Sequence, residues 1–469
     1  GIANVFNVQS LSNATKTTRL QEGWREQTQS IFGSAEIGFK GAYYLTLTAR
    51  NDWPSQLAGP HSNRKSFFYP SIGGSVVLSQ IIPNMPKELE YLKIRGSYAS
   101  VGTAFERYIA NPMYSWNTSG LSWNTQTQYP VYDLKPELTN SFEIGLSMRF
   151  LQYFNFDATY YHTNTRNQTF NPQISTGSGS SDIFIQSGDV RNQGLELTLG
   201  FDKTWDKFTW NSNYTFSFNE NRIMSLAENV TNPATGEKFS VSQLDMNGLG
   251  LAHFILREGG TLGDLYSLGD FNYDSNGRII VNEDGTVTTR TFSDTKDYVK
   301  LGSVLPKANM SWRNDFNIAG FNFGFLVSAR LGGIVYSSTQ AILDYYGVSE
   351  ASALARDNGG VYLNGGDRLD ANKWYSSVGG SNPLPQEYTY SGTNVRLQEA
   401  SVGYTFPRKM LGNVCDLNIS VVGRNLWMIY NKAPFDPESI ATTGNYYQGI
   451  DHFMMPSLRN FGFSVRVTF

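Results

Sequence analysis

The sequence predicts an all-β protein built as a transmembrane antiparallel β-barrel, and three observations predict it. Apolar and polar residues alternate in many short segments, short and long connections alternate between these segments, and no run of about 18 apolar residues is present. In the final segment, 459–469, three phenylalanines and two valines fall on one side of an extended strand, with Gly462, Ser464, Arg466 and Thr468 on the other. That segment alone also fits a soluble sandwich, so the rest of the chain decides.

Composition favours one continuous fold. The 469 residues contain no Pro-rich or Ser-rich linker, and the 27 Tyr, 30 Phe and 45 Gly suit many aromatic strands joined by turns. A net charge of -3 gives no signal for nucleic-acid binding. Cys415 is the single cysteine, which excludes intrachain disulfides and cysteine metal clusters.

Thirteen strands with a period of two residues are predicted. In the eleventh, Val395 and Leu397 have one parity while Ala400 and Val402 have the other, so we expect a β-bulge near Gln398 and Glu399. The thirteen segments are 35–40, 43–50, 72–78, 92–98, 142–150, 154–160, 195–201, 208–218, 308–316, 321–331, 395–406, 417–430 and 459–469.

The lengths of the connections favour a barrel over a sandwich. Outer-membrane barrels place short turns on the periplasmic side and long loops outside, whereas a sandwich has no reason to sort its loops in this way. With Phe469 at the periplasmic end, the long external loops are expected at 102–138, 222–304, 332–392 and 431–456, and residues 1–27 also lie outside. Bacterial single-chain barrels have even strand numbers, so residues 28–469 are expected to be the C-terminal part of a larger barrel whose first part is another chain or is missing.

Several motifs, in a consistent order, resemble the SusC/RagA family of TonB-dependent outer-membrane transporters. The resemblance runs from about residue 30 to the C-terminus. The motifs are SIFGSAEIGFK at 30–40, ARNDWPS at 49–55, FYPSIGGS at 68–75, LKIRGSYA at 92–99, EGGTLGD at 258–264, VRLQEASVGYTFP at 395–407, GRNLW at 423–427 and DPE at 436–438.

The resemblance implies a 22-strand barrel with a plug in its lumen, in the outer membrane of a Bacteroidetes-like Gram-negative bacterium. It implies a SusD-like surface lipoprotein as partner and the TonB complex as energy source, with a glycan or oligopeptide nutrient as cargo. The family's plug, N-terminal extension and signal peptide are expected upstream of Gly1. The alternative is a surface protein without a plug, either an adhesin or a passive porin. The motifs do not separate glycan importers from peptide importers.

Charged residues of both signs share the strand parity that is opposite to the lipid-facing residues. A wall of mixed charge can hydrogen-bond a plug, whereas an ion-selective pore more often shows one dominant sign. The expected lumen-facing plug contacts are Arg95, Glu143, Arg149, Glu196, Arg313, Arg330, Arg424 and Arg466.

Aromatic residues in the expected external loops are candidate contacts for the cargo or for the cap. Aromatic faces suit both sugar rings and peptide side chains, and packing within the loops is the competing interpretation. These residues are Trp116, Trp123, Tyr345, Tyr346, Trp374 and Tyr375.

The sequence carries no catalytic motif, and we expect neither an enzyme nor a resident cofactor. The four histidines lie in different segments without metal-ligand spacing, and G-x-S-x-G is absent. Asn272, Asp274, Asn276, Gly277 and Glu283 match positions 1, 3, 5, 6 and 12 of a calcium loop. However, position 1 is usually Asp and flanking helices are not evident, so a hairpin turning at Asn276-Gly277 is favoured over a calcium site.

Overall fold

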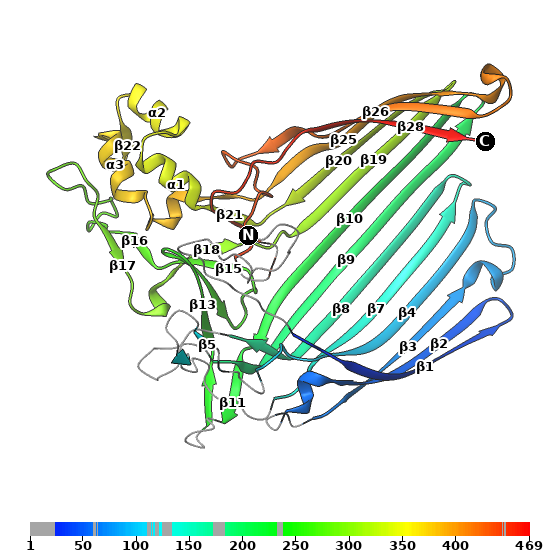
Figure 1. The fold of residues 1–469 in the computed structure, drawn as a ribbon, viewed down its shortest axis with the longest axis horizontal. Coiled ribbons are helices and arrows are strands. Elements are labelled where there is room, and N and C mark those ends of the chain that lie inside the picture. The colour runs from blue at the N-terminus through cyan, green and yellow to red at the C-terminus, as the bar shows by residue number, and fades with distance from the viewer. Residues whose placement is uncertain are drawn as a thin grey trace, which may run out of the picture.

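The main element is a single sheet of thirteen antiparallel strands (Figure 1). The structure, a computed structural model, describes residues 24–59, 62, 64–109, 114, 116–117, 122–123, 134–171, 183–231, 238–442, 444 and 447–469. In spatial order the strands are β1 (Thr28–Phe39), β2 (Tyr43–Pro54), β3 (Phe67–Val77), β4 (Leu89–Thr103), β7 (Glu137–Phe150), β8 (Phe154–Phe170), β9 (Ile185–Trp205), β10 (Phe208–Ser225), β19 (Ala308–Ile318), β20 (Phe321–Leu331), β25 (Asn394–Phe406), β26 (Asp416–Asn431) and β28 (Asn460–Thr468).

All thirteen predicted strands are confirmed, and several are longer than expected. The strand β9 extends ten residues before the predicted start at Leu195, because it goes on pairing with β8 where apolar and polar residues no longer alternate. The predicted bulge is also confirmed. Leu326 pairs with Glu399 and Val327 pairs with Leu397, which leaves Gln398 without a partner on β20.

The short turns follow the geometry that tight hairpins require. Leu151 and Gln152, between β7 and β8, have φ values of 54° and 65°. Positive φ at both central residues gives a turn whose twist matches that of the flanking strands. β7 and β8 accordingly pair without a register shift along the whole ladder from Phe150–Phe154 to Leu138–Arg166.

One face of the sheet is apolar and exposed, and we call it the apolar face. Strand pairing brings Leu47, Ile72, Tyr98 and Phe142 into one row across β2, β3, β4 and β7. All four side chains are exposed. Soluble monomers do not normally expose a continuous apolar surface of this extent, whereas contact with lipid accounts for it. The fold is therefore a transmembrane β-barrel wall.

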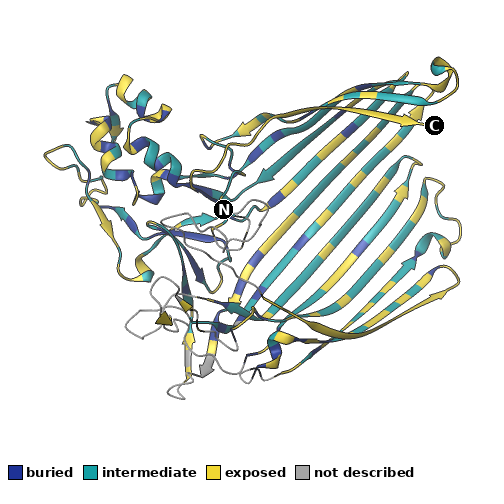
Figure 2. Ribbon diagram, in the orientation of Figure 1, coloured by how far each residue is buried: buried dark blue, intermediate teal, exposed yellow. Residues whose placement is uncertain are grey.

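Most of the hydrophobic core lies in the long connections, and it packs against the ends of β8, β9 and β10 that adjoin them (Figure 2). Phe254, Leu265, Tyr336 and Tyr388 are fully buried there. The elements of the connections are β5 (Trp116–Asn117), β6 (Ser122–Trp123), β11 (Ala227–Thr231), β12 (Lys238–Val241), β13 (Gln243–Leu249), β14 (Ala252–Arg257), β15 (Asp264–Ser267), β16 (Gly269–Phe271), β17 (Thr289–Thr291), β18 (Val299–Ser303), β21 (Ile334–Ser337), α1 (Ser338–Tyr345), α2 (Glu350–Asp357), β22 (Val361–Leu363), β23 (Asp367–Leu369), α3 (Ala371–Val378), β24 (Thr389–Ser391) and β27 (Ile450–Asp451).

The long connections of the main sheet run over residues 104–136, 226–307, 332–393 and 432–459, close to the predicted bounds, and their placement outside the cell stays a prediction. Residues 1–23 of the expected first external segment, and much of 102–138, lie outside the described residues. In the described ranges, the helices are all too short or too polar to cross a bilayer.

Candidate functional site

The eight charged residues predicted to share a face do share it. Pairing from strand to strand places Arg95, Glu196 and Arg330 in one row. A second row contains Arg149, Arg313 and Arg424. Glu143 lies two residues from the first row on β7, and Arg466 pairs with Asn418, six residues from Arg424 on β26. We call this side of the sheet the polar face; contact with a plug stays a prediction.

Arg95 organises one part of the polar face. Its guanidinium donates two parallel hydrogen bonds to the Asp157 carboxylate, at 2.9 and 2.8 Å, and also bonds the hydroxyls of Ser147 at 2.6 Å and Thr159 at 2.5 Å. The side chain reaches from β4 across β7 to β8 by passing over Gly145. A Cβ at residue 145 would lie 2.6 Å from the Arg95 Cζ, so only glycine leaves room for this crossing.

A network of alternating charges lies on the polar face over β19, β25 and β26. Arg313 donates to Asp315 at 2.8 and 3.1 Å and lies 3.4 Å from Glu399, whose second carboxylate oxygen accepts from Arg424 at 2.9 Å. The side chains of Arg313 and Arg424 are 47% and 67% exposed. Because exposed ion pairs each contribute about 0 to 1 kcal/mol, the arginines of this network can exchange one carboxylate partner for another polar group at small cost.

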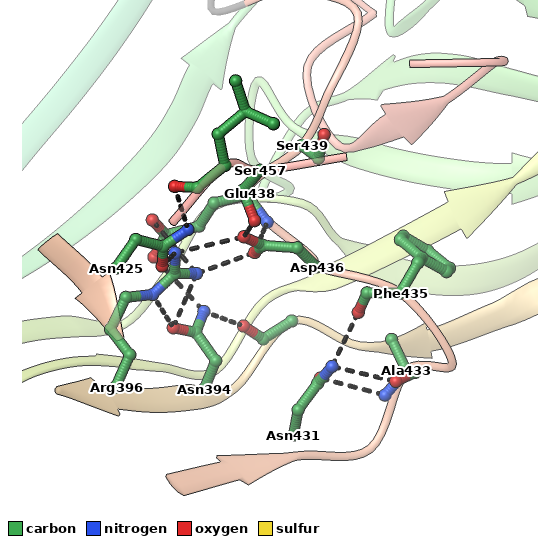
Figure 3. A network of polar contacts seen from close by, with 12 residues as sticks. Asn394, Arg396, Asn425, Asn431, Ala433, Phe435, Asp436, Glu438, Ser439 and Ser457 are labelled. Atoms are coloured by element: carbon green, nitrogen blue, oxygen red, sulfur yellow. Dashed lines mark hydrogen bonds and ion pairs between the residues drawn. The ribbon is translucent and has the colours of Figure 1, made fainter. Parts of the chain in front are cut away.

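A buried cluster joins the last connection to the loop ends of β25 and β26 (Figure 3). The Arg396 guanidinium donates to both oxygens of Asp436, at 2.7 and 3.1 Å, and lies 3.4 Å from Glu438. Asn394 accepts from Arg396 at 3.3 Å and donates to Glu438. The side chains of Arg396 and Asp436 are only 5% and 10% exposed. We call these residues the loop-end cluster.

The loop-end cluster holds Asp436 ionised. Burial alone would raise the pKa of Asp436, but hydrogen bonds from Arg396, from the Ser457 hydroxyl and from the backbone N–H of Glu438 outweigh burial, so its pKa lies below the usual value. The turn at 436–438 is therefore fastened to β25 by a charged pair that needs both of its members.

The sequence anticipated the D-P-E motif but not its partner. Arg396 and Asp436 belong to different elements, and no spacing rule connects them. The one available signal was the position of Arg396. It is a charged residue near the start of a strand, and its neighbours on the same face of the sheet are polar.

The predicted aromatic contacts fall into two groups. Trp116 and Trp123 pair directly on β5 and β6, with ring centroids 5.2 Å apart in an edge-to-face arrangement, and both are exposed. Tyr345 and Tyr346 form a second exposed pair with the same centroid separation. These four rings are available to a ligand.

The other two aromatic residues pack within the connections. Trp374 is buried and stacks on Phe271, with centroids 5.8 Å apart, and Tyr375 is half-buried against the same core. For Trp374 this arrangement fits the packing interpretation, because a buried ring has no face left for cargo.

The segment considered for calcium forms two successive tight turns. The Asp274 carboxylate accepts hydrogen bonds from the backbone N–H groups of Asn276 and Arg278, and Tyr273 bridges to Ile279. Gly277 has a φ of 75° at the turn. The hairpin interpretation is confirmed for the backbone. No group of three or more His, Cys, Asp or Glu side chains gathers for a metal within the ranges that the structure describes.

Comparison with known families identifies the chain's relatives. The family described as "TonB dependent receptor-like, beta-barrel" matches residues 3–305. The chain belongs to this family. Its members are outer-membrane proteins. Two receptors of Formosa agariphila are similar: TonB-dependent receptor P3 is 23% identical over 94% of this chain and 45% of its own length, and P26 is 25% identical over 100% and 48%. The chain thus spans about half the length of these curated relatives.

Solved structures of the RagAB peptide importer share the fold. The closed-closed state matches with a TM-score of 0.72 and 16% identity over 94% of this chain and 48% of that one. The open-open state matches with a TM-score of 0.73 and 16% identity over 98% and 49%. The agreement over nearly the whole chain shows that its sheet is built like the corresponding part of a TonB-dependent barrel.

Proposed function

We propose that this chain forms part of the barrel wall of a SusC-like importer, which works with a SusD-like surface lipoprotein and the TonB complex. The cargo would be a glycan or an oligopeptide. The observation that carries the proposal is the thirteen-stranded sheet with one exposed apolar face and one polar face, in a fold that matches the RagAB importer. Residues 28–469 would then be the C-terminal portion of the barrel, completed by the part that bears the plug.

In this proposal the polar face lines the lumen and holds the plug. Some of its charged side chains pair with one another, as Arg313 and Arg424 do with Glu399. Such pairs can exchange one partner for a polar group of the plug at a cost of about 1 kcal/mol or less each. Many weak contacts hold a plug in place, yet a pulling force can release them one after another.

The four long connections would lie on the outer side, where the cap and the cargo meet. Exposed rings at Trp116, Trp123, Tyr345 and Tyr346 supply flat apolar surface for sugar rings or peptide side chains. The loop-end cluster would fix the last connection over the lumen, because Arg396 ties Asp436 to the sheet itself.

The experiment isolates the protein from its native outer membrane and identifies co-purified ligands and proteins by mass spectrometry. We expect a surface lipoprotein and an oligopeptide or glycan. Uptake of that ligand, isotope-labelled, is then measured in cells with and without a protonophore. Uptake by a TonB-dependent importer stops when the proton gradient collapses. Uptake that continues would establish a passive porin, and the recovery of neither ligand nor lipoprotein would favour an adhesin.

A further inference from the structure

A depression of about 320 Å³ lies on the apolar face, where β8, β9 and β10 continue past the apolar band toward the long connections. The end of the depression nearer the apolar band is lined by Tyr98 and Phe142, both exposed. The end nearer the long connections is lined by Asn164, Arg166, Asp189 and Arg191. The depression therefore has an apolar end beside the lipid-facing band and a polar, basic end above it.

Strand register shows that this polar group faces the same way as the lipid-facing residues. Tyr98 pairs with Phe142, and Phe142 pairs with His162 on β8. The next pairs along β8 and β9 on this face are Asn164 with Arg191 and Arg166 with Asp189. The charges are thus on the outside of the wall, away from the polar face and from any plug.

Several of these groups have unused hydrogen-bonding capacity. The Nε of Arg191, the Oδ1 of Asp189 and the Oδ1 of Asn164 are buried and have no hydrogen-bond partner within the described part of the chain. No ion pair joins Arg166 or Arg191 to a carboxylate there either. Buried polar atoms without partners are unfavourable, so a ligand that pairs with them gains affinity.

We propose that the depression binds the phosphorylated sugar headgroup of a membrane lipid. The guanidinium groups of Arg166 and Arg191 match a phosphate, because planar N–H donors pair with phosphate oxygens in a bidentate manner. The oxygens of Asp189 and Asn164 accept from sugar hydroxyl or amide groups. The acyl chains continue onto Tyr98 and Phe142 and join the lipid that already covers the apolar face. That this leaflet is the outer one rests on the orientation proposed above.

The experiment measures lipid binding to the full-length protein in detergent by native mass spectrometry. The protein is titrated with bis-phosphorylated lipid A and, separately, with phosphatidylethanolamine. We expect saturable binding of lipid A that is about tenfold weaker in Arg166→Gln/Arg191→Gln. The matched control, Lys207→Gln/Lys409→Gln, removes two exposed charges at the short turns of the sheet, and it should bind lipid A like the unaltered protein.

Each outcome supports or overturns the proposal. Equal lipid A binding by the double variant and the unaltered protein overturns it, and so does displacement of lipid A by millimolar inorganic phosphate, which would identify a free-anion site. Folding of each variant is checked by its heat-modifiable gel mobility. If the double variant fails to fold, Arg166→Gln alone replaces it, because Arg166 is exposed. Saturable lipid A binding by a protein whose cargo uptake continues after the proton gradient collapses would refute the proposed function and leave this site intact.

Discussion

Replacing Arg396 with methionine should loosen the last connection without unfolding the barrel. The substitution leaves Asp436 buried with only the Ser457 hydroxyl and the Glu438 N–H as donors. Breaking one side of a buried ion pair costs about 3 to 5 kcal/mol. At roughly 1.4 kcal/mol per tenfold change, even the lower figure raises the opening equilibrium of this segment about a hundredfold.

The assay is hydrogen exchange of backbone amides in residues 431–442, measured on the full-length protein in detergent. Arg408→Met is the matched control, because Arg408 and Asp416 also form an Arg–Asp pair but are 44% and 41% exposed. That control should change the free energy of local opening, as measured by exchange, by less than about 1 kcal/mol. The double variant Arg396→Met/Asp436→Leu should recover much of the protection from exchange that Arg396→Met loses, since it leaves no unpaired buried aspartate. Equal exchange in Arg396→Met and Arg408→Met would refute the reasoning.

Three further predictions concern the polar face, pH and the aromatic residues. Gly145→Leu should destabilise the barrel by up to about 1 kcal/mol in denaturant unfolding, because its side chain displaces the partly exposed Arg95 from Asp157, whereas Gly462→Ala, with open space around it, should have little effect. Since the pKa of Asp436 is lowered in the folded protein, its stabilising contribution is complete above the ordinary carboxyl pKa of about 4 and is lost as pH falls through the lower folded value. Exchange in 431–442 should therefore rise only below about pH 4, and a rise near pH 6 would contradict this. Trp374→Ala should cost about 3 to 5 kcal/mol in the connections, while Trp123→Ala should change stability by less than about 0.5 kcal/mol and weaken cargo binding instead.

The strands could be predicted from the sequence because lipid and water impose opposite requirements on alternate residues. Where the lipid band ends, that constraint ends too, and β9 continues from Leu195 back to Ile185 by backbone pairing that leaves no alternation to read. The same loss of signal hid the depression beside Arg166 and Arg191, which keep the lipid-facing parity but are polar.

The contacts within the connections could not be predicted, because they join segments far apart in the chain. Trp374 packs on Phe271, and Arg396 pairs with Asp436, through tertiary structure alone. Local sequence nevertheless predicted the turn at Asn276-Gly277 and the bulge at Gln398, because both depend only on neighbouring residues.

A membrane-spanning wall requires that one face of this sheet meets lipid and the other does not. Spin labels placed singly at Asn213, Tyr214, Thr215 and Phe216 of β10, in a Cys415→Ser background and in lipid bilayers, test it by their accessibility to oxygen and to a water-soluble nickel reagent. High oxygen accessibility is expected at Tyr214 and Phe216, and low values are expected at Asn213 and Thr215. Equal accessibility of all four labels to the nickel reagent would contradict a membrane-spanning wall.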